Sequence, residues 1–98
     1  MPVYLLIEIE IHNKDIYFEY IERARPLVER YGGHYLIRGG NAAPLFGEWK
    51  PERIILIQFP SREDVDRCFS SKEYLEIKPL RDNSTSTRAI ILDGFEEN

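Results

Sequence analysis

Arginine is the residue type whose positions in this chain most clearly suggest chemistry. Arg38 ends the apolar run "HYLIR", Arg53 begins "RIILIQF", and Arg88 lies near the start of the final apolar run "STRAIILDG". A guanidinium group binds a carboxylate or phosphate through paired donors, so arginines gathered at strand ends favour a small anionic or enolic ligand. In the alternative, Arg38 and Arg53 form ion pairs within the chain and only stabilise a hairpin. The carboxylates considered for these pairs are Glu48, Glu52 and Asp93.

The segment after Arg38 reads as a functional loop. Gly39 and Gly40 let the backbone leave the strand in conformations that larger residues avoid, which fixes the arginine at the strand end. About a dozen residues then lead to Glu52, more than a typical hairpin loop has, and "NAAPLFGEW" is too apolar for simple disorder. We expect a flap that packs over the sheet or onto a partner subunit. Trp49 within it is either a packing residue of the hairpin or a wall of a pocket.

Other catalytic signals are weak. His34 is the candidate general base because histidine titrates near neutral pH, although a solvated histidine after a glycine turn is the more ordinary interpretation. Glu8, Glu10 and His12 share a strand face, but they would span about 13 Å and could not converge on one metal ion. The chain has no serine elbow, phosphate loop, CxxC pair or dinucleotide fingerprint. We therefore expect neither a metal nor a cofactor, and the catalytic residues stay unassigned.

Composition predicts one small domain over residues 1–98, with a mass of 11.6 kDa. The net charge of -4 provides no basic excess for a phosphate backbone, so nucleic acid is not an expected partner. No stretch approaches the roughly 20 apolar residues of a membrane span, and we expect a cytoplasmic protein without a leader. The single cysteine, Cys68, excludes an internal disulfide and is expected in the core, with a reactive thiol as the alternative.

Periodicity predicts the elements that position these residues. Residues 3–11 alternate as a strand with one fully apolar face, and Asn13 caps a helix that ends at Gly32, with a kink or break expected at Pro26. Strands follow at 34–38 and 52–59. Ser61 opens a second helix, and Ser70 with Glu73 opens a brief helical turn that Pro79 limits. The last strand is residues 86–94.

This order predicts an α+β, ferredoxin-like βαββαβ fold with a four-stranded antiparallel sheet and helices on one face. Right-handed crossovers place the first and third strands in the centre and the second and fourth at the edges. The uncovered face still carries Tyr4, Leu6 and alternate apolar residues of the later strands. Because an isolated apolar sheet face would be a large exposed patch, we expect a homodimer packed sheet to sheet.

The chain resembles the family known as domain of unknown function 1330, in the dimeric α/β-barrel superfamily. The resemblance rests on "RYGGHYLIRGG" at 30–40, "GEWKPERIILIQFPS" at 47–61, "EYLEIKPLR" at 73–81 and "STSTRAIILDG" at 84–94. It implies a ferredoxin-like subunit, a dimer and a ligand cleft, and superfamily relatives include cofactor-independent monooxygenases and muconolactone-type isomerases. The family pattern falls on Arg38, Gly39, Gly40, Gly47, Trp49, Pro51, Arg53, Tyr74, Arg81 and Arg88. His34, Cys68 and Phe69 depart from it.

Two function classes follow from these observations. The first is a small-molecule-binding protein or cofactor-independent enzyme that holds a small anionic or enolic ligand in an arginine-lined pocket. Its expected ligand-binding residues are Arg38, Gly39, Gly40, Trp49, Arg53, Tyr74, Arg81 and Arg88. The alternative is a structural dimerisation domain without a ligand, in which internal ion pairs occupy the arginines.

Overall fold

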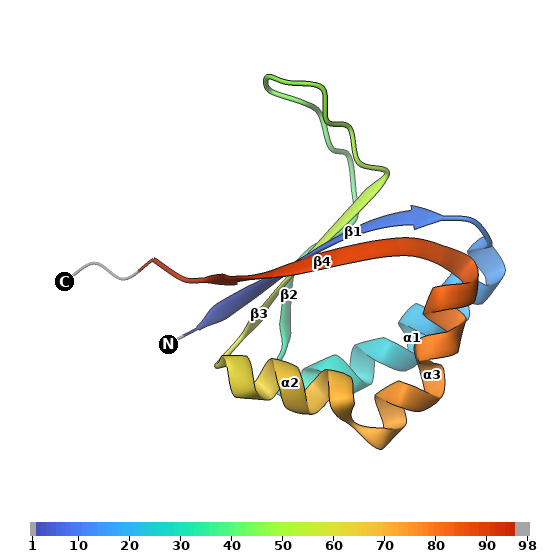
Figure 1. The fold of residues 1–98 in the computed structure, drawn as a ribbon, viewed down its shortest axis with the longest axis vertical. Helices are drawn as coiled ribbons and strands as arrows, with labels where there is room; N and C mark the ends of the chain where they lie inside the picture. The colour runs from blue at the N-terminus through green and yellow to red at the C-terminus, as the bar shows by residue number, and fades with distance from the viewer. Residues whose placement is uncertain (1, 96–98) are drawn as a thin grey trace.

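The computed structural model describes residues 2–95 and contains one four-stranded antiparallel sheet with the strand order β2-β3-β1-β4. Three helices lie on one side of this sheet (Figure 1). The elements are β1 (Val3–Ile11), α1 (Lys14–Arg30), β2 (His34–Arg38), β3 (Arg53–Phe59), α2 (Arg62–Ser70), α3 (Lys72–Ser84) and β4 (Thr85–Asp93). The predicted ferredoxin-like order and the central position of β1 and β3 are therefore confirmed, with α2 and α3 together in the place of the second helix.

Local signals in the sequence explain where α1 begins and ends. The Asn13 side chain accepts a hydrogen bond from the backbone N–H of Ile16 at 3.1 Å, as an N-cap residue should. At the other end Gly32 has a φ of +88°, the left-handed conformation that glycine adopts without strain. Tyr17, Ala24 and Val28 form the buried side of the helix.

Neither proline ends its helix, so the local break expected at Pro26 and the limit expected at Pro79 are wrong, and a kink at Pro26 stays a prediction. α1 continues without a break through Pro26, and α3 continues past Pro79 to Ser84. A proline leaves the carbonyl four residues earlier without its helical partner, but both prolines lie on exposed helix surface, where water can replace the lost hydrogen bond. The cap of α3 also differs from the prediction, because Ser71 rather than Ser70 accepts the hydrogen bond from the Tyr74 N–H at 3.1 Å.

The two faces of the sheet have different surroundings. Val3, Leu5 and Ile9 of β1 are buried beneath the helices, together with Ile55, Ile57 and Phe59 of β3. The opposite face has no covering helix, and there the register places Leu6 between Leu56 and Ile90, and Tyr4 beside Leu92. We call this opposite side the open face. It is apolar in its middle, as predicted.

A β-bulge in β2 decides which face its side chains occupy. Tyr35 pairs with Ile57 and Ile37 with Leu56, so Leu36 is an extra residue without a partner on β3. Arg38 then pairs with Ile55. Because cross-strand partners share a face, Tyr35 and Arg38 both lie on the helix-covered side, although they are three residues apart.

The connection between β2 and β3 extends away from the body of the domain (Figure 1). Leu45 and Phe46 near its tip are almost fully exposed. The tip does not pack over the sheet of its own chain, although Trp49, which follows it, donates a hydrogen bond to Glu8 of β1 at 3.1 Å. Packing of the tip onto a partner subunit stays a prediction. Among residues 2–95, no helix combines the length and the apolar character that a membrane crossing needs.

Candidate functional site

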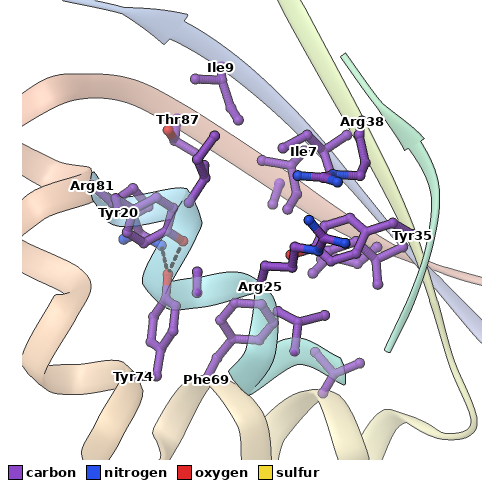
Figure 2. A pocket seen from close by; sticks show the side chains of 18 of the residues that line it. Ile7, Ile9, Tyr20, Arg25, Tyr35, Arg38, Phe69, Tyr74, Arg81 and Thr87 are labelled. Carbon is purple, nitrogen blue, oxygen red and sulfur yellow. Dashed lines mark hydrogen bonds between the residues drawn. The ribbon is translucent and has the colours of Figure 1, made fainter. Parts of the chain in front are cut away.

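A cavity of about 500 Å³ lies between the helix-covered face of the sheet and the three helices (Figure 2). Apolar side chains of β1, β3 and β4 form one side, including Ile7, Ile57 and Ile91, and Val28 and Phe69 contribute from the helices. Its size falls in the range of small-molecule pockets, which is about 300 to 1,000 Å³.

One end of the cavity carries a hydrogen-bonded group of Tyr20, Tyr74 and Arg81 (Figure 2). The two tyrosine hydroxyl oxygens lie 2.8 Å apart, and Arg81 Nη1 donates to Tyr74 Oη at 3.0 Å. Burial raises the pKa of Tyr20 and that of Tyr74, so both phenols stay protonated near neutral pH. The two tyrosines have two O–H protons, and the bond between them uses one. The second remains available to donate to a ligand.

Arg81 is held in place by its neighbour. Its Nε and Nη2 both donate to Asp82 Oδ1, at 3.1 and 2.9 Å. The guanidinium charge at this end of the cavity is therefore already balanced by a carboxylate, and only Nη1 is directed at Tyr74.

The other end of the cavity carries Arg25, Arg38 and Tyr35. The Arg38 Cζ atom lies 5.3 Å from the centre of the Tyr35 ring, within cation–π range, and the side chain of Arg25 extends to the same region (Figure 2). Within residues 2–95, no carboxylate forms a salt bridge with Arg38, and Arg25 has only a long contact of 3.8 Å with Glu29. This end of the cavity therefore has unbalanced positive charge. Burial raises the pKa of Tyr35 to about 12, against the opposing effect of Arg38.

Arg53 and Tyr17 lie close to this cationic end. The Arg53 Cζ atom is 5.6 Å from the centre of the Tyr17 ring. Tyr17 Oη and Arg53 Nε are both buried, and neither has a hydrogen-bond partner among residues 2–95. Gly39 gives Arg53 its space, because a Cβ atom at position 39 would collide with Arg53 Nη1. Gly39 also has a φ of +84°, so this glycine is required on two grounds.

The eight residues predicted to bind ligand fall into three groups. Arg38, Tyr74 and Arg81 line the cavity. Gly39 and Arg53 support its cationic end, and Gly40 lies in the connection that follows. The remaining two, Trp49 and Arg88, instead meet at Glu8 on the open face, where both donate hydrogen bonds to its carboxylate. The ion pairs considered for Arg38 and Arg53 are not present in the described part of the chain. Of the three carboxylates considered for them, Glu52 instead accepts a hydrogen bond from the Ile11 N–H.

Two further sequence candidates lie away from the cavity. His34 is exposed and pairs across the sheet with Gln58. Because Ile57 and Phe59 on either side of Gln58 face the helices, Gln58 and His34 lie on the open face. Cys68 is fully buried, and burial raises the pKa of its thiol to about 11, as expected of a core cysteine.

The carboxylate of Glu8 is held by its two hydrogen-bond donors. The hydrogen bonds from Arg88 and, to a smaller extent, from Trp49 keep the pKa of Glu8 below its usual value.

Sequence reasoning missed Tyr20, Arg25 and Tyr35. Helical spacing places the tyrosines of α1 on its inward side, which accounts for their rings but not for their hydroxyl groups. A buried tyrosine needs a partner for its hydroxyl, and several tyrosines on one inward stripe therefore indicate a polar site within the core. That signal was present in the sequence at Tyr17 and Tyr20.

Comparison with known proteins identifies the fold and the family. A protein of unknown function from Rhodopseudomonas palustris, RPA0582, superposes with a TM-score of 0.83 at 18% identity, covering 98% of this chain and 84% of that chain. SnoaB, a cofactor-independent oxygenase from Streptomyces nogalater, superposes with a TM-score of 0.71 at 6% identity, covering 98% and 95%. The de novo designed protein Foldit4 superposes at 0.64 with 16% identity, covering 97% and 100%.

These identities are low enough that the similarity demonstrates the fold alone, and the designed protein illustrates that the fold can exist without any inherited activity. No curated protein matches the chain. The model of the family described as domain of unknown function (DUF1330) matches residues 2–95. The chain belongs to this family.

Proposed function

We propose that the protein binds a small anionic or enolic molecule in the cavity between the sheet and the helices. The observation that carries the proposal is the cationic end of the cavity, where Arg38 has no salt-bridge carboxylate among residues 2–95 and Arg25 has only a contact of 3.8 Å with Glu29. A guanidinium group binds a carboxylate or phosphate through paired, charge-assisted hydrogen bonds. Of the predicted binding residues, the proposal keeps Arg38, Tyr74 and Arg81 as ligand contacts.

Gly39, Gly40 and Arg53 have indirect roles in this proposal. Arg53 adds positive charge behind Tyr17, and Gly39 leaves the space that Arg53 occupies. Gly40 begins the connection that leaves the site. Trp49 and Arg88 belong to the open face, and the proposal therefore assigns them to contact with a partner subunit rather than with the ligand.

The proposal extends to cofactor-independent catalysis through one physical argument. Cations and neutral hydrogen-bond donors that line an apolar cavity stabilise the anionic form of an enol, which is the form that reacts. The similarity of fold to SnoaB, a cofactor-independent oxygenase, supports testing this possibility but does not transfer the activity. His34 is not part of it, because this residue lies on the other side of the sheet.

The open face supports a homodimer as the second part of the proposal. Ile37, Ile90 and Leu92 remain exposed there in the single chain, and they flank the central Leu6 and Leu56. Packing two such faces together removes this apolar surface from water, and a two-fold axis brings identical patches into contact. A dimerisation domain without a ligand would have the same face but would not require the cavity. A cytoplasmic location completes the proposal and is consistent with a single, buried cysteine.

A thermal-shift screen against small carboxylates, enols, phosphates and aromatic acids tests the binding proposal. A ligand present at about one hundred times its dissociation constant stabilises the native state by about 2.7 kcal/mol, which raises the melting temperature of so small a domain by roughly ten degrees. We expect a stabilising acid, and we expect its effect to disappear in Arg38→Ala.

The matched control is Arg23→Ala on the outer surface of α1, where Arg23 forms a salt bridge with Glu19 and does not line the cavity. This variant should retain the full thermal shift. Equal shifts in Arg38→Ala and Arg23→Ala would place the ligand elsewhere, and the absence of any stabilising compound would favour the dimerisation domain.

A further inference from the structure

The two ends of the cavity have different chemistry, and this difference specifies the ligand beyond its charge. Tyr20 lines the donor end and Arg25 the cationic end, and both project from α1. Five residues separate them along the helix, which corresponds to roughly 7.5 Å along its axis. Most of the other lining side chains are apolar, among them Ile7, Ile57 and Phe69, and the polar exceptions are Asp66, Ser70 and Thr87.

The cationic end suits a carboxylate. Arg38 has no salt-bridge partner among residues 2–95, and its guanidinium lies over the Tyr35 ring rather than in water alone. Its planar set of donors remains available to an anion, and a carboxylate accepts two parallel hydrogen bonds from such a group. Arg25 adds a second cation at this end.

The donor end does not suit a second anion. Asp82 already balances the charge of Arg81, through contacts of 3.1 and 2.9 Å. The neutral donor at this end is the one O–H proton of the Tyr20–Tyr74 pair that their mutual hydrogen bond leaves unused. A neutral acceptor oxygen, such as that of a ketone, satisfies this donor without adding charge.

We infer that the ligand is a monocarboxylic acid with an apolar, ring-sized body and a neutral acceptor oxygen at the end opposite its carboxylate. The carboxylate contacts Arg38 and Arg25, and the acceptor oxygen receives the free proton of the Tyr20–Tyr74 pair. This inference rests on the proposed function, because it requires that the cavity be the binding site.

Isothermal calorimetry with three related probes tests the inference. The probes are para-acetylphenylpropanoate, which has both end groups, para-ethylphenylpropanoate, which lacks the acceptor oxygen, and para-ethylacetophenone, which lacks the carboxylate. We expect the first to bind about fivefold tighter than the second, the effect of one neutral hydrogen bond, and about tenfold or more tighter than the third.

Variants then assign each preference to one end of the cavity. The double variant Tyr20→Phe with Tyr74→Phe should bind both acids equally, because it removes the donor pair but retains the rings. Arg38→Gln should remove the preference for the acid over the neutral ketone. Tyr31→Phe is the matched control, since Tyr31 does not line the cavity, and it should leave all three affinities unchanged.

The outcomes separate this inference from the proposed function. If the wild-type protein binds both acids equally well, the acceptor-oxygen inference is wrong while the anion site stands. If it binds neither acid, the inferred ligand is wrong, and the thermal-shift screen decides the anion site separately. The comparison of the two acids uses the wild-type protein, so it decides the question even if the double variant does not fold.

Discussion

Tyr74 and Arg81 lie two turns apart on α3, and Arg81 Nη1 donates to Tyr74 Oη at 3.0 Å. This contact connects the surface ion pair between Arg81 and Asp82 to the buried hydroxyl pair between Tyr74 and Tyr20. The polar end of the cavity is thus a single network that begins at the surface and ends in the core.

Removal of the central hydroxyl should destabilise this network. Tyr74→Phe leaves the Tyr20 hydroxyl and one N–H of Arg81 without their partner, and we expect the free energy of unfolding to fall by about 1 to 2 kcal/mol. Urea denaturation measures the change. The double variant with Tyr20→Phe should lose less than the sum of the two single variants, because both members of the pair are then replaced. Strictly additive losses would argue against the hydrogen bond.

Gly39 should tolerate substitution less well than Gly40. Both have a positive φ, +84° and +99°, so alanine is strained at either position, but only at position 39 does a Cβ collide with Arg53. We expect Gly39→Ala to cost about 1 kcal/mol or more beyond Gly40→Ala in urea denaturation. Arg53→Ala should remove most of the difference between the two glycine variants. A difference that persists in that background would show that the collision is not its cause.

The open face should control the oligomeric state. Light scattering of the wild-type protein should give twice the chain mass of 11.6 kDa. Ile90→Glu places a charge in the middle of the apolar face, and we expect a monomer that retains its secondary structure by circular dichroism. Leu75→Glu is the matched control, because Leu75 is as exposed as Ile90, at 53% and 54%, but lies on a helix. A monomeric wild-type protein, or two dimeric variants, would contradict sheet-to-sheet packing.

The buried tyrosines predict a loss of stability in alkali. Burial raises the pKa of Tyr17, Tyr20, Tyr35 and Tyr74 in the folded state, that of Tyr35 to about 12. Since an unfolded tyrosine ionises near pH 10, the unfolded state loses its protons first, and the stabilisation is complete below about pH 10 and decreases above it. The absorbance of phenolate and the urea midpoint, followed together against pH, measure both effects. Full ionisation of every tyrosine in the native protein near pH 10 would refute this assignment.

β1 was predictable because its apolar side chains alternate, and β2, β3 and β4 because each is a short run rich in apolar and β-branched residues. The predicted bounds of β1 and β2 are correct, and those of β3 and β4 differ by one residue. The prolines at 26 and 79 were misjudged, because their effect depends on whether the orphaned carbonyl faces water, and that depends on tertiary packing.

The site was only partly predictable. Arg38, Tyr74 and Arg81 do line one cavity, but simple alternation along β2 places Tyr35 and Arg38 on opposite faces, and nothing in "HYLIR" marks Leu36 as bulged. The face occupied by Arg88 follows from its pairing with Glu8 in the register of β1 and β4. Alternation along β1 already places Glu8 on the face opposite the apolar one, which is the open face.

The bulge at Leu36 also affects how relatives should be aligned with this chain. Because Leu36 has no cross-strand partner, a version of β2 that lacked this residue would pair regularly and would still direct Tyr35 and Arg38 inward. A relative with one residue fewer in this strand could therefore keep the same cation in the same place. An alignment that forbids a gap inside a strand would not align the arginine of such a relative with Arg38. The cation would then seem to be missing, although only the strand had become one residue shorter.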